Sequence, residues 1–244
     1  MTNNTDHVAL VTGANKGIGY EIARQLALTG VSVLLGARDA GRGKSAAKEL
    51  VSQGLNVAFI QIDICDGESI AAAAAKIDAE HGRLDILVNN AGIADYTDGA
   101  PSVAALDTVR RVYETNFIGA LAVTQSMLPL LRRSEAGRIV NMSSSLGSLT
   151  LNGDPSWQFY DVKLIGYNAS KAALNMLTVQ LNAELRETKI TAVSACPGLV
   201  NTELSGNRGD RTPAEAAVFV VRLARLTDHD ALGAYQSEQG TVPW

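Results

Sequence analysis

The 244-residue chain has little cysteine, little charge and no long apolar run, and each shortage excludes a class of protein. Its two cysteines, Cys65 and Cys196, each end an apolar, strand-like run, which favours a reducing compartment over a disulfide framework. Charged residues make up 19% of the chain and the net charge is −4, with no long basic run, so neither nucleic acids nor anionic membranes are expected partners. No apolar run reaches the about 18 residues that a membrane span needs, and residues 1–7 lack the basic and apolar regions of a secretory signal. We therefore expect a soluble, cytoplasmic protein.

What the chain does contain predicts one α/β domain. Hydrophobic residues make up 46% of it and 22 residues are glycine, which suits a single large domain with a well-buried core. Short apolar runs alternate with segments of helical spacing. The predicted strands are 7–12, 31–36, 56–63, 84–88, 137–142, 190–196 and 234–236, and the clearest helices are 68–80, 103–132, the one that carries Tyr167, and 213–226.

The first predicted strand runs into a glycine-rich turn, Thr12-Gly13-Ala14-Asn15-Lys16-Gly17-Ile18-Gly19, that begins a helix. Such a turn binds phosphate, because unpaired N–H groups and the helix dipole face it and glycines let the backbone approach closely. The glycine spacing differs from the usual dinucleotide fingerprint, and a tight turn in any α/β protein is the alternative. The candidate cofactor contacts here are Gly13, Asn15, Lys16, Gly17, Ile18 and Gly19.

The tip of the second predicted strand indicates which dinucleotide binds. An acidic residue there binds the ribose hydroxyls of NAD, whereas an arginine accommodates the 2′-phosphate of NADP. Arg38 comes first in this chain, and Lys16 in the glycine turn is expected to reach the same phosphate. The sequence therefore predicts NADP(H), with a solvated Arg38 beside a ribose-binding Asp39 as the alternative.

Later strand ends supply further candidates. Asp63 is placed to accept a hydrogen bond from the adenine amino group while the backbone of Ile64 lines the ring, unless Asp63 only flanks the turn before the next helix. Asn90, Ala91 and Gly92 follow the fourth strand, at the carboxyl edge where parallel sheets bind ligands. Asn and Gly are also ordinary loop residues, so this turn alone indicates little.

Tyr167 and Lys171 are four residues apart, so they share one face of a helix. An ammonium beside a phenol favours the phenolate and is expected to lower the pKa of Tyr167, which would let it transfer a proton near neutral pH. The alternative is a surface lysine one turn after a half-buried tyrosine. Asn116 lies in the middle of the predicted helix 103–132, where it either bonds the backbone locally or holds a water in an active site.

Taken together, these elements resemble the short-chain dehydrogenase/reductase family over nearly the whole chain. They are Thr12-Gly13-x-x-x-Gly17-x-Gly19, Asp63, Asn89-Asn90-Ala91-Gly92, Asn116, Ser144, Tyr167-x-x-x-Lys171 and Pro197-Gly198 through Thr202. Asn15-Lys16, the tip at 35–39 and the ending Pro243-Trp244 are similar to the carbonyl reductase-like branch, which generally uses NADPH. The resemblance implies a single α/β domain over 1–244, built on a Rossmann-like doubly wound parallel sheet of about seven strands with helices on both faces. It also implies reduction of a ketone or aldehyde by hydride transfer, reversible in principle.

The resemblance further implies roles for single residues. Tyr167 protonates the carbonyl oxygen, and Lys171 holds the nicotinamide ribose and lowers the pKa of Tyr167. Ser144 donates a hydrogen bond to the same oxygen, whereas Ser143 and Ser145 are expected to be turn hydroxyls. Asn116 anchors a water that links Lys171 to solvent. The remaining implied cofactor contacts are Pro197, Gly198, Val200 and Thr202.

Two segments depart from regular structure. Ser144 and Tyr167 are 23 positions apart, more than in most family members, so 149–165 is expected to be a short insertion. Its aromatic residues either wall a substrate pocket or pack the loop down, and they are Trp157, Phe159 and Tyr160. The segment 199–211 is expected to be a mobile lid over the substrate.

The expected partner is a small carbonyl or alcohol substrate, and no metal is expected. A homodimer or homotetramer is possible, although the insertion leaves this open because the Tyr167 helix commonly forms the family's subunit interface. The alternatives are a 3-oxoacyl carrier-protein reductase, which would need a basic docking surface of which Arg132 and Arg133 are the only sign, and a non-catalytic NADP(H) sensor. The joint presence of Ser144, Tyr167 and Lys171 favours an enzyme over a sensor.

Overall fold

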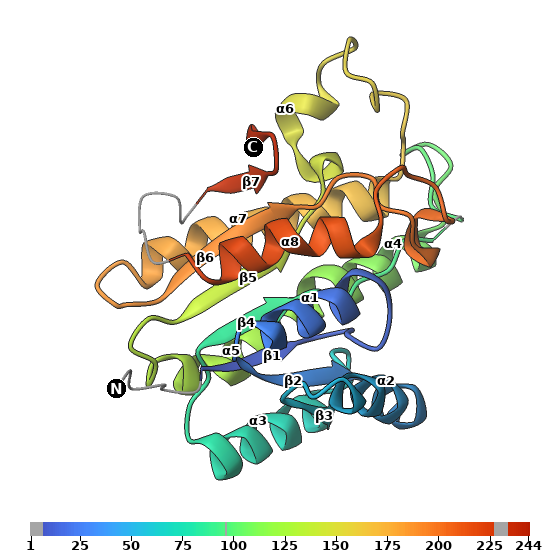
Figure 1. Ribbon diagram of the computed structural model, residues 1–244. Coiled ribbons are helices and arrows are strands. Elements are labelled where there is room, and N and C mark those ends of the chain that lie inside the picture. The colour runs from blue at the N-terminus through green and yellow to red at the C-terminus, as the bar shows by residue number, and fades with distance from the viewer. Residues whose placement is uncertain (1–6, 96, 227–233) are drawn as a thin grey trace.

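The computed structural model describes residues 7–95, 97–226 and 234–244 (Figure 1). In these residues one eight-stranded sheet has the order β3-β2-β1-β4-β5-β6-β7-β8. All neighbouring pairs are parallel except β7 with β8. The strands are β1 Val8–Val11, β2 Ser32–Ala37, β3 Val57–Gln61, β4 Ile86–Asn89, β5 Arg138–Met142, β6 Thr191–Cys196, β7 Tyr235–Ser237 and β8 Gly240–Thr241. The predicted doubly wound parallel sheet is confirmed, with the antiparallel β8 added to the expected seven strands.

Helices cover both faces of the sheet because its strands are apolar on both sides (Figure 1). In β1, Ala9 and Val11 belong to one buried cluster, whereas Val8 and Leu10 belong to the other. The first cluster includes residues of α1 Gly17–Leu28, α2 Ala40–Ser52 and α8 Pro213–Ala224. The second includes residues of α3 Gly67–His81, α5 Ala120–Leu131 and α7 Ile165–Glu184. No helix among the described residues is long and apolar enough to cross a bilayer.

The strand order reverses at β1, which pairs with β2 on one side and with β4 on the other. Ligands bind outside the carboxyl ends of the strands at such a switch point, because the connections leave in opposite directions there. The glycine turn at 12–19 follows β1 directly, and the turn at 89–92 follows β4. The fold therefore brings the two turns together at the carboxyl edge of the sheet.

The predicted helix over 103–132 is helical from Leu106 to Leu131, but it is not one regular α-helix. Helix α4 covers Leu106–Tyr113, a π-helical turn covers Glu114–Gly119, and α5 follows. The π-turn inserts one extra residue without ending the apolar pattern, so residue spacing does not reveal it. The segment 149–165 contains the short helix α6 Leu149–Asn152, which projects from the body of the molecule with the loop that follows it (Figure 1).

Candidate active site

Tyr167 and Lys171 lie on the buried face of α7, 8% and 5% exposed respectively. The N-cap residue Leu164 offers no side-chain cap to this helix. The cap comes instead from Asp98, in the loop after β4, whose carboxylate accepts from the backbone N–H of Gly166 at 3.0 Å and of Tyr167 at 2.8 Å. A carboxylate suits the positive end of a helix dipole, so Asp98 fixes the turn that carries Tyr167. Sequence analysis missed it, since an aspartate about 70 residues away carries no local capping signal.

The pKa of Tyr167 moves opposite to the prediction. Burial raises it to about 12, and the hydrogen bond with the Ser144 side chain only partly opposes this. Lys171 donates through Nζ to the Met142 carbonyl at 2.8 Å, and Nζ lies 5.5 Å from the centroid of the Tyr167 ring. Burial also lowers the pKa of Lys171 to about 8. The expected lowering of the Tyr167 pKa by Lys171 is therefore wrong for this structure, because burial of both side chains outweighs their proximity.

The three serines after β5 have different partners. Ser143 donates from Oγ to Asn175 Oδ1 at 2.6 Å, and the backbone N–H of Ser145 donates to Cys196 Sγ at 3.1 Å. Ser144 is the serine whose side chain acts on Tyr167, since it lowers the pKa of the Tyr167 phenol. Its Oγ also accepts from the Leu146 N–H at 3.3 Å, which leaves the hydroxyl proton to donate elsewhere.

Gly147 lets the serine loop pack directly on the catalytic helix. A Cβ there would lie 2.8 Å from both the carbonyl carbon and the Cβ of Lys171, too close for any side chain. The site therefore needs glycine three residues after Ser144. The same three-residue spacing to Gly147 identifies Ser144 among the three serines in the sequence.

Asn116 is presented by the π-turn and is 1% exposed. Its Oδ1 accepts from the Ile93 N–H at 2.8 Å, and its Nδ2 donates to the Ile93 carbonyl at 2.9 Å and to Ser170 Oγ at 3.0 Å. The Asn116 side chain thus bonds the backbone, as one alternative predicted. The backbone that it bonds is not local, however, but belongs to Ile93 in the loop after β4. A Cβ on Gly92 would lie 3.1 Å from Asn116 Oδ1 and 3.6 Å from Lys171 Nζ, so this loop closes on both side chains.

The glycine turn fits a backbone cradle for phosphate. Gly13 and Gly17 have φ of +63° and +60°, which side-chain-bearing residues rarely adopt. A Cβ on Gly19 would lie 2.3 Å from Asn90 Nδ2, whose amide donates to the carbonyls of Thr12 at 2.8 Å and Gly13 at 3.2 Å. Asn90 therefore supports the turn from the end of β4. The N-cap residue of α1 makes no side-chain cap, which leaves its first N–H groups facing the turn.

The two predicted phosphate-binding cations each have an acidic partner. Lys16 forms an ion pair with Glu203, and Arg38 Nε lies 4.0 Å from Asp63 Oδ2, with the Arg38 side chain 74% exposed. Asp39 caps α2, since its Oδ1 accepts from the Arg42 N–H at 2.8 Å. Its Oδ2 also lies 3.2 Å from Arg42 Nε. The helix thus engages the carboxylate that the NAD alternative required, which favours Arg38 as the residue that selects the cofactor.

Asp63 and Ile64 lie just beyond the end of β3. Asp63 Oδ1 accepts from the Cys65 N–H at 3.1 Å, and the Asp63 N–H donates to Ser69 Oγ at 2.9 Å. Asp63 therefore does stabilise the turn before α3, as the alternative held, while its Oδ2 faces Arg38. Ile64 packs against Gly119 of the π-turn, since a Cβ on Gly119 would lie 2.8 Å from the carbonyl oxygen of Ile64.

The segment 199–211 folds back on itself and reaches the glycine turn. Gly198 has φ of +79°, and the Pro197 carbonyl accepts from Arg211 Nη1 at 2.9 Å. Val200 forms a β-bridge with Arg211. Thr202 Cγ2 would lie 3.7 Å from a Cβ on Gly17, so the predicted cofactor residues of this segment stand beside the phosphate cradle.

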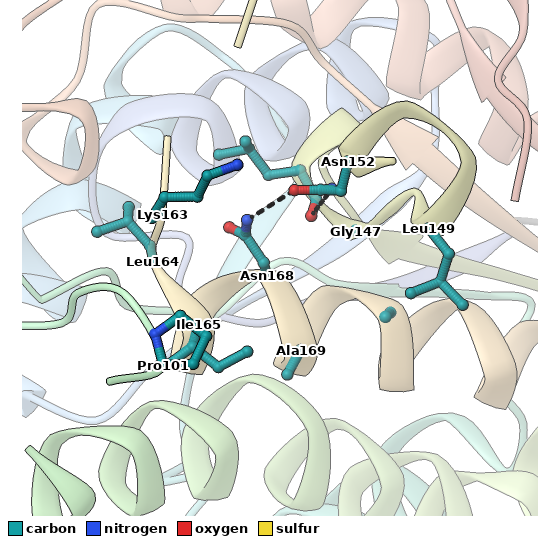
Figure 2. A pocket seen from close by; sticks show the side chains of 11 residues that line it. Pro101, Gly147, Leu149, Asn152, Lys163, Leu164, Ile165, Asn168 and Ala169 are labelled. Carbon is teal, nitrogen blue, oxygen red and sulfur yellow. Dashed lines mark hydrogen bonds between the residues drawn. The ribbon is translucent and has the colours of Figure 1, made fainter. Parts of the chain in front are cut away.

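The aromatic residues of 149–165 pack on their own segment. The rings of Trp157 and Phe159 meet edge to face with centroids 5.5 Å apart, and Lys163 Nζ lies 3.7 Å from the centroid of the Tyr160 ring. A nearby cavity of about 230 Å³ is lined by none of the three aromatics (Figure 2). Its lining residues are Pro101, Leu146, Gly147, Leu149, Asn152, Lys163, Leu164, Ile165, Asn168, Ala169 and Ala172. These contacts favour the alternative in which the aromatics hold the loop down.

The cavity borders a different face of α7 from the one that carries Tyr167. Figure 2 shows Asn168 reaching toward Asn152, with Nδ2 of Asn168 3.0 Å from Oδ1 of Asn152. Ile165, Asn168, Ala169 and Ala172 recur at helical spacing along this cavity face, whereas Tyr167 and Lys171 point to the buried side.

Comparison with known proteins agrees with this geometry. The family model described as short chain dehydrogenase matches residues 7–213. The chain belongs to the short-chain dehydrogenase family. Similar members include short-chain dehydrogenase anuI of Penicillium roqueforti, 37% identical over 92% of this chain and 90% of the relative. Carbonyl reductase [NADPH] 1 of Rattus norvegicus is 33% identical over 97% of this chain and 98% of its own length.

Solved structures place this short-chain dehydrogenase near the carbonyl reductases. The NADPH-bound carbonyl reductase from chicken fatty liver has a TM-score of 0.85 and 32% identity, covering 98% of this chain and 99% of its own. An actinorhodin polyketide ketoreductase with NADPH has a TM-score of 0.83 and 29% identity, covering 98% and 97%. The predicted family and its carbonyl reductase-like branch are confirmed.

Proposed function

We propose that this short-chain dehydrogenase is an NADPH-dependent carbonyl reductase that acts on a ketone or aldehyde, with Tyr167 as proton donor. The observation that carries the proposal is the joint placement of Ser144, Tyr167 and Lys171 beside a glycine turn that fits a pyrophosphate. NADPH, when bound, supplies the hydride. The names of the rat and chicken relatives support the same reaction and cofactor.

The chain's own residues supply the acid and stabilise the charge. Because the pKa of Tyr167 is about 12, its phenol is protonated at neutral pH, as the donor in a reduction must be. Ser144 donates a hydrogen bond to the carbonyl oxygen as negative charge develops there. Lys171 holds the ribose hydroxyls, and we retain for Asn116 the anchoring of a water that replaces the proton.

NADP(H) rather than NAD(H) follows from the tip of β2. Arg38 is exposed and next to the cradle, while Asp39 is engaged by α2. We propose that Arg38 and Lys16 turn from their acidic partners to the 2′-phosphate, because a dianion attracts a cation more strongly than one carboxylate does. The other proposed contacts remain those of the sequence prediction, namely Gly13, Asn15, Gly17, Ile18, Gly19, Asp63, Ile64, Asn90, Ala91, Gly92, Pro197, Gly198, Val200 and Thr202.

The alternative of a 3-oxoacyl carrier-protein reductase finds little support in the surface charges. Arg133 pairs with Asp78 of α3 and donates to the Gly82 carbonyl at 2.8 Å. It follows the carboxyl end of α5, and helices of a doubly wound fold end at the sheet edge opposite the ligand site. The Arg132 and Arg133 pair is therefore not a docking surface beside Tyr167. We also retain the predicted cytoplasmic location.

The test measures oxidation of NADPH and of NADH against a panel of ketones, aldehydes and β-keto esters. We expect turnover with NADPH well above NADH, and loss of nearly all turnover in Tyr167→Phe with NADPH affinity unchanged. Tyr20→Phe, which removes the same hydroxyl from α1, is the matched control. Substantial turnover by Tyr167→Phe would refute the assignment of the acid, and a wild-type protein that binds NADPH without any turnover would favour the sensor.

A further inference from the structure

Ser144 is held by its main chain as well as by its side chain. Its carbonyl oxygen accepts a hydrogen bond from the hydroxyl of Tyr235, the first residue of β7. Tyr235 has no exposed surface, and its ring stacks on that of Trp244 with centroids 5.4 Å apart and planes 26° apart. The same hydroxyl also interacts with the side chains of Ser143 and Asn175. A buried phenol that the proposed reaction does not use thus stands directly behind the serine loop.

The residues after Tyr235 bind the same stretch of chain. Ser148 Oγ donates to the Pro243 carbonyl at 2.6 Å, and Thr150 donates to the main-chain oxygen of Trp244 from its N–H at 2.9 Å and from its Oγ1 at 2.6 Å. Figure 1 shows the C-terminal end beside α6 accordingly. Two segments more than 90 positions apart in sequence are therefore joined along the loop that begins with Ser144.

The Ser144 carbonyl oxygen accepts from the Gly147 N–H at 2.7 Å within the loop, and Tyr235 supplies the contact to the same oxygen from outside the loop. Ser145 is held through its N–H by Cys196, and the Gly147 carbonyl accepts from Asn175 Nδ2 at 3.3 Å. Ser144 itself is extended, with φ of −158° and ψ of 145°, and its Oγ swings with any rotation of its peptide planes. The two bonds to its carbonyl oxygen, from Gly147 and from Tyr235, therefore decide together where the hydroxyl lies relative to Tyr167.

We propose that Tyr235 is a positioning residue that fixes the main chain of Ser144 and so aims the Ser144 hydroxyl at Tyr167. The inference rests on the proposed reductase function, in which Ser144 donates to the substrate oxygen. An error of about 1 Å in the placement of such a donor costs on the order of 100-fold in rate. The residue acts through Ser144 and touches neither substrate nor cofactor.

Tyr235→Phe is the variant of choice, because the phenyl ring keeps the stack on Trp244 and only the hydroxyl is lost. We expect kcat for reduction to fall about 10- to 100-fold, with the NADPH dissociation constant unchanged. A loss confined to kcat, with cofactor affinity unchanged, is not what a merely structural role would cause.

A double-mutant cycle with Ser144→Ala tests the route of the effect. If Tyr235 acts through Ser144, Tyr235→Phe lowers the wild-type rate but leaves the residual rate of Ser144→Ala unchanged. Equal fold-losses in both backgrounds would overturn the inference, as would a wild-type kcat in Tyr235→Phe. Ser148→Ala is the control, because it removes the hydrogen bond from Ser148 to the Pro243 carbonyl and leaves the bonds to Ser144 in place. This variant should keep kcat within about twofold of wild type.

The order of measurement separates this inference from the proposed function. Wild-type carbonyl reduction and its loss in Tyr167→Phe are established first. If both hold and Tyr235→Phe behaves as wild type, only the positioning role fails. If the wild-type protein reduces no carbonyl, the reductase proposal fails and this inference fails with it.

Discussion

Lys171 is expected to lower the stability of the protein that it serves. The residue is 5% exposed, and burial lowers its pKa from the ordinary 10.5 to about 8. That difference corresponds to about 3 kcal/mol by which the folded state disfavours the charged lysine at neutral pH. Lys171→Met keeps an unbranched side chain of similar length in the same site and removes the charge.

The stability gained by removing the buried charge is partly offset by the loss of the hydrogen bond that Lys171 makes. Its Nζ donates to the Met142 carbonyl at 2.8 Å, and an orphaned buried carbonyl costs about 1–3 kcal/mol. We therefore expect Lys171→Met to be more stable than wild type by about 1 kcal/mol at pH 7, which raises Tm by about 2–4 °C in a domain of this size. Carbonyl reduction should be lost at the same time, because the proposed ribose ligand is gone.

The pH dependence of the difference identifies its cause. Between the folded pKa of about 8 and the unfolded 10.5, the unfolded state holds a proton that the folded state has released, so wild-type stability rises with pH. Below pH 8 the full penalty is present, and the advantage of Lys171→Met should shrink by about 1–2 kcal/mol from pH 8 to 9.5.

Urea unfolding at half-unit pH steps measures this difference directly. Lys44→Met, on the exposed side of α2, is the control and should track wild type at every pH. A variant that is less stable than wild type at pH 7, with a difference that does not change up to pH 9.5, would refute the claim that burial of this charge is costly.

Two further substitutions probe the cofactor cradle. Glu203→Gln frees Lys16 for the 2′-phosphate, because the exposed ion pair contributes little on its own. In a fluorescence titration, NADPH binding should tighten about 2- to 5-fold while NADH binding stays unchanged. Weaker NADPH binding in this variant would contradict the proposed role of Lys16. Gly19→Ala places a Cβ 2.3 Å from Asn90 Nδ2 and should weaken NADPH binding at least about tenfold and lower Tm. Gly67→Ala, with nothing within 4 Å of the new Cβ, should do neither, and a loss of binding there would mean that any added methyl is harmful.

The layers of the fold were predictable because burial repeats along the chain. In β1 the alternation of Val8 and Leu10 with Ala9 and Val11 assigns each residue to one of two helical layers. The π-turn at Asn116 was not predictable, since its partner Ile93 lies 23 positions away and one extra residue barely disturbs helical spacing. Local pattern thus specified the elements but not the irregular turn that presents a functional side chain.

The candidate site shows the same division. The spacing of Tyr167 and Lys171 gave their shared helix face, but the direction of the Tyr167 pKa depends on burial, which spacing does not report. Asp39 and Arg38 illustrate the converse case. The sequence favoured Arg38 and left Asp39 as the alternative, and the cap on α2 shows that the Asp39 carboxylate is already engaged.

Side chains outside the family motifs brace two members of the proposed catalytic set, Tyr167 and Ser144. Asp98 caps the turn of Tyr167, and Tyr235 holds the carbonyl of Ser144. Asp98 lies in the loop after β4 and Tyr235 begins β7, the last parallel strand of the sheet, and sequence motifs are sparse in both places. Trp157 and Phe159 pack on each other, whereas Asn152 is the residue of 149–165 that bonds both the serine loop and α7. We therefore expect changes at Trp157 or Phe159 to act on the packing of the loop and to leave the pH dependence of proton transfer unaltered.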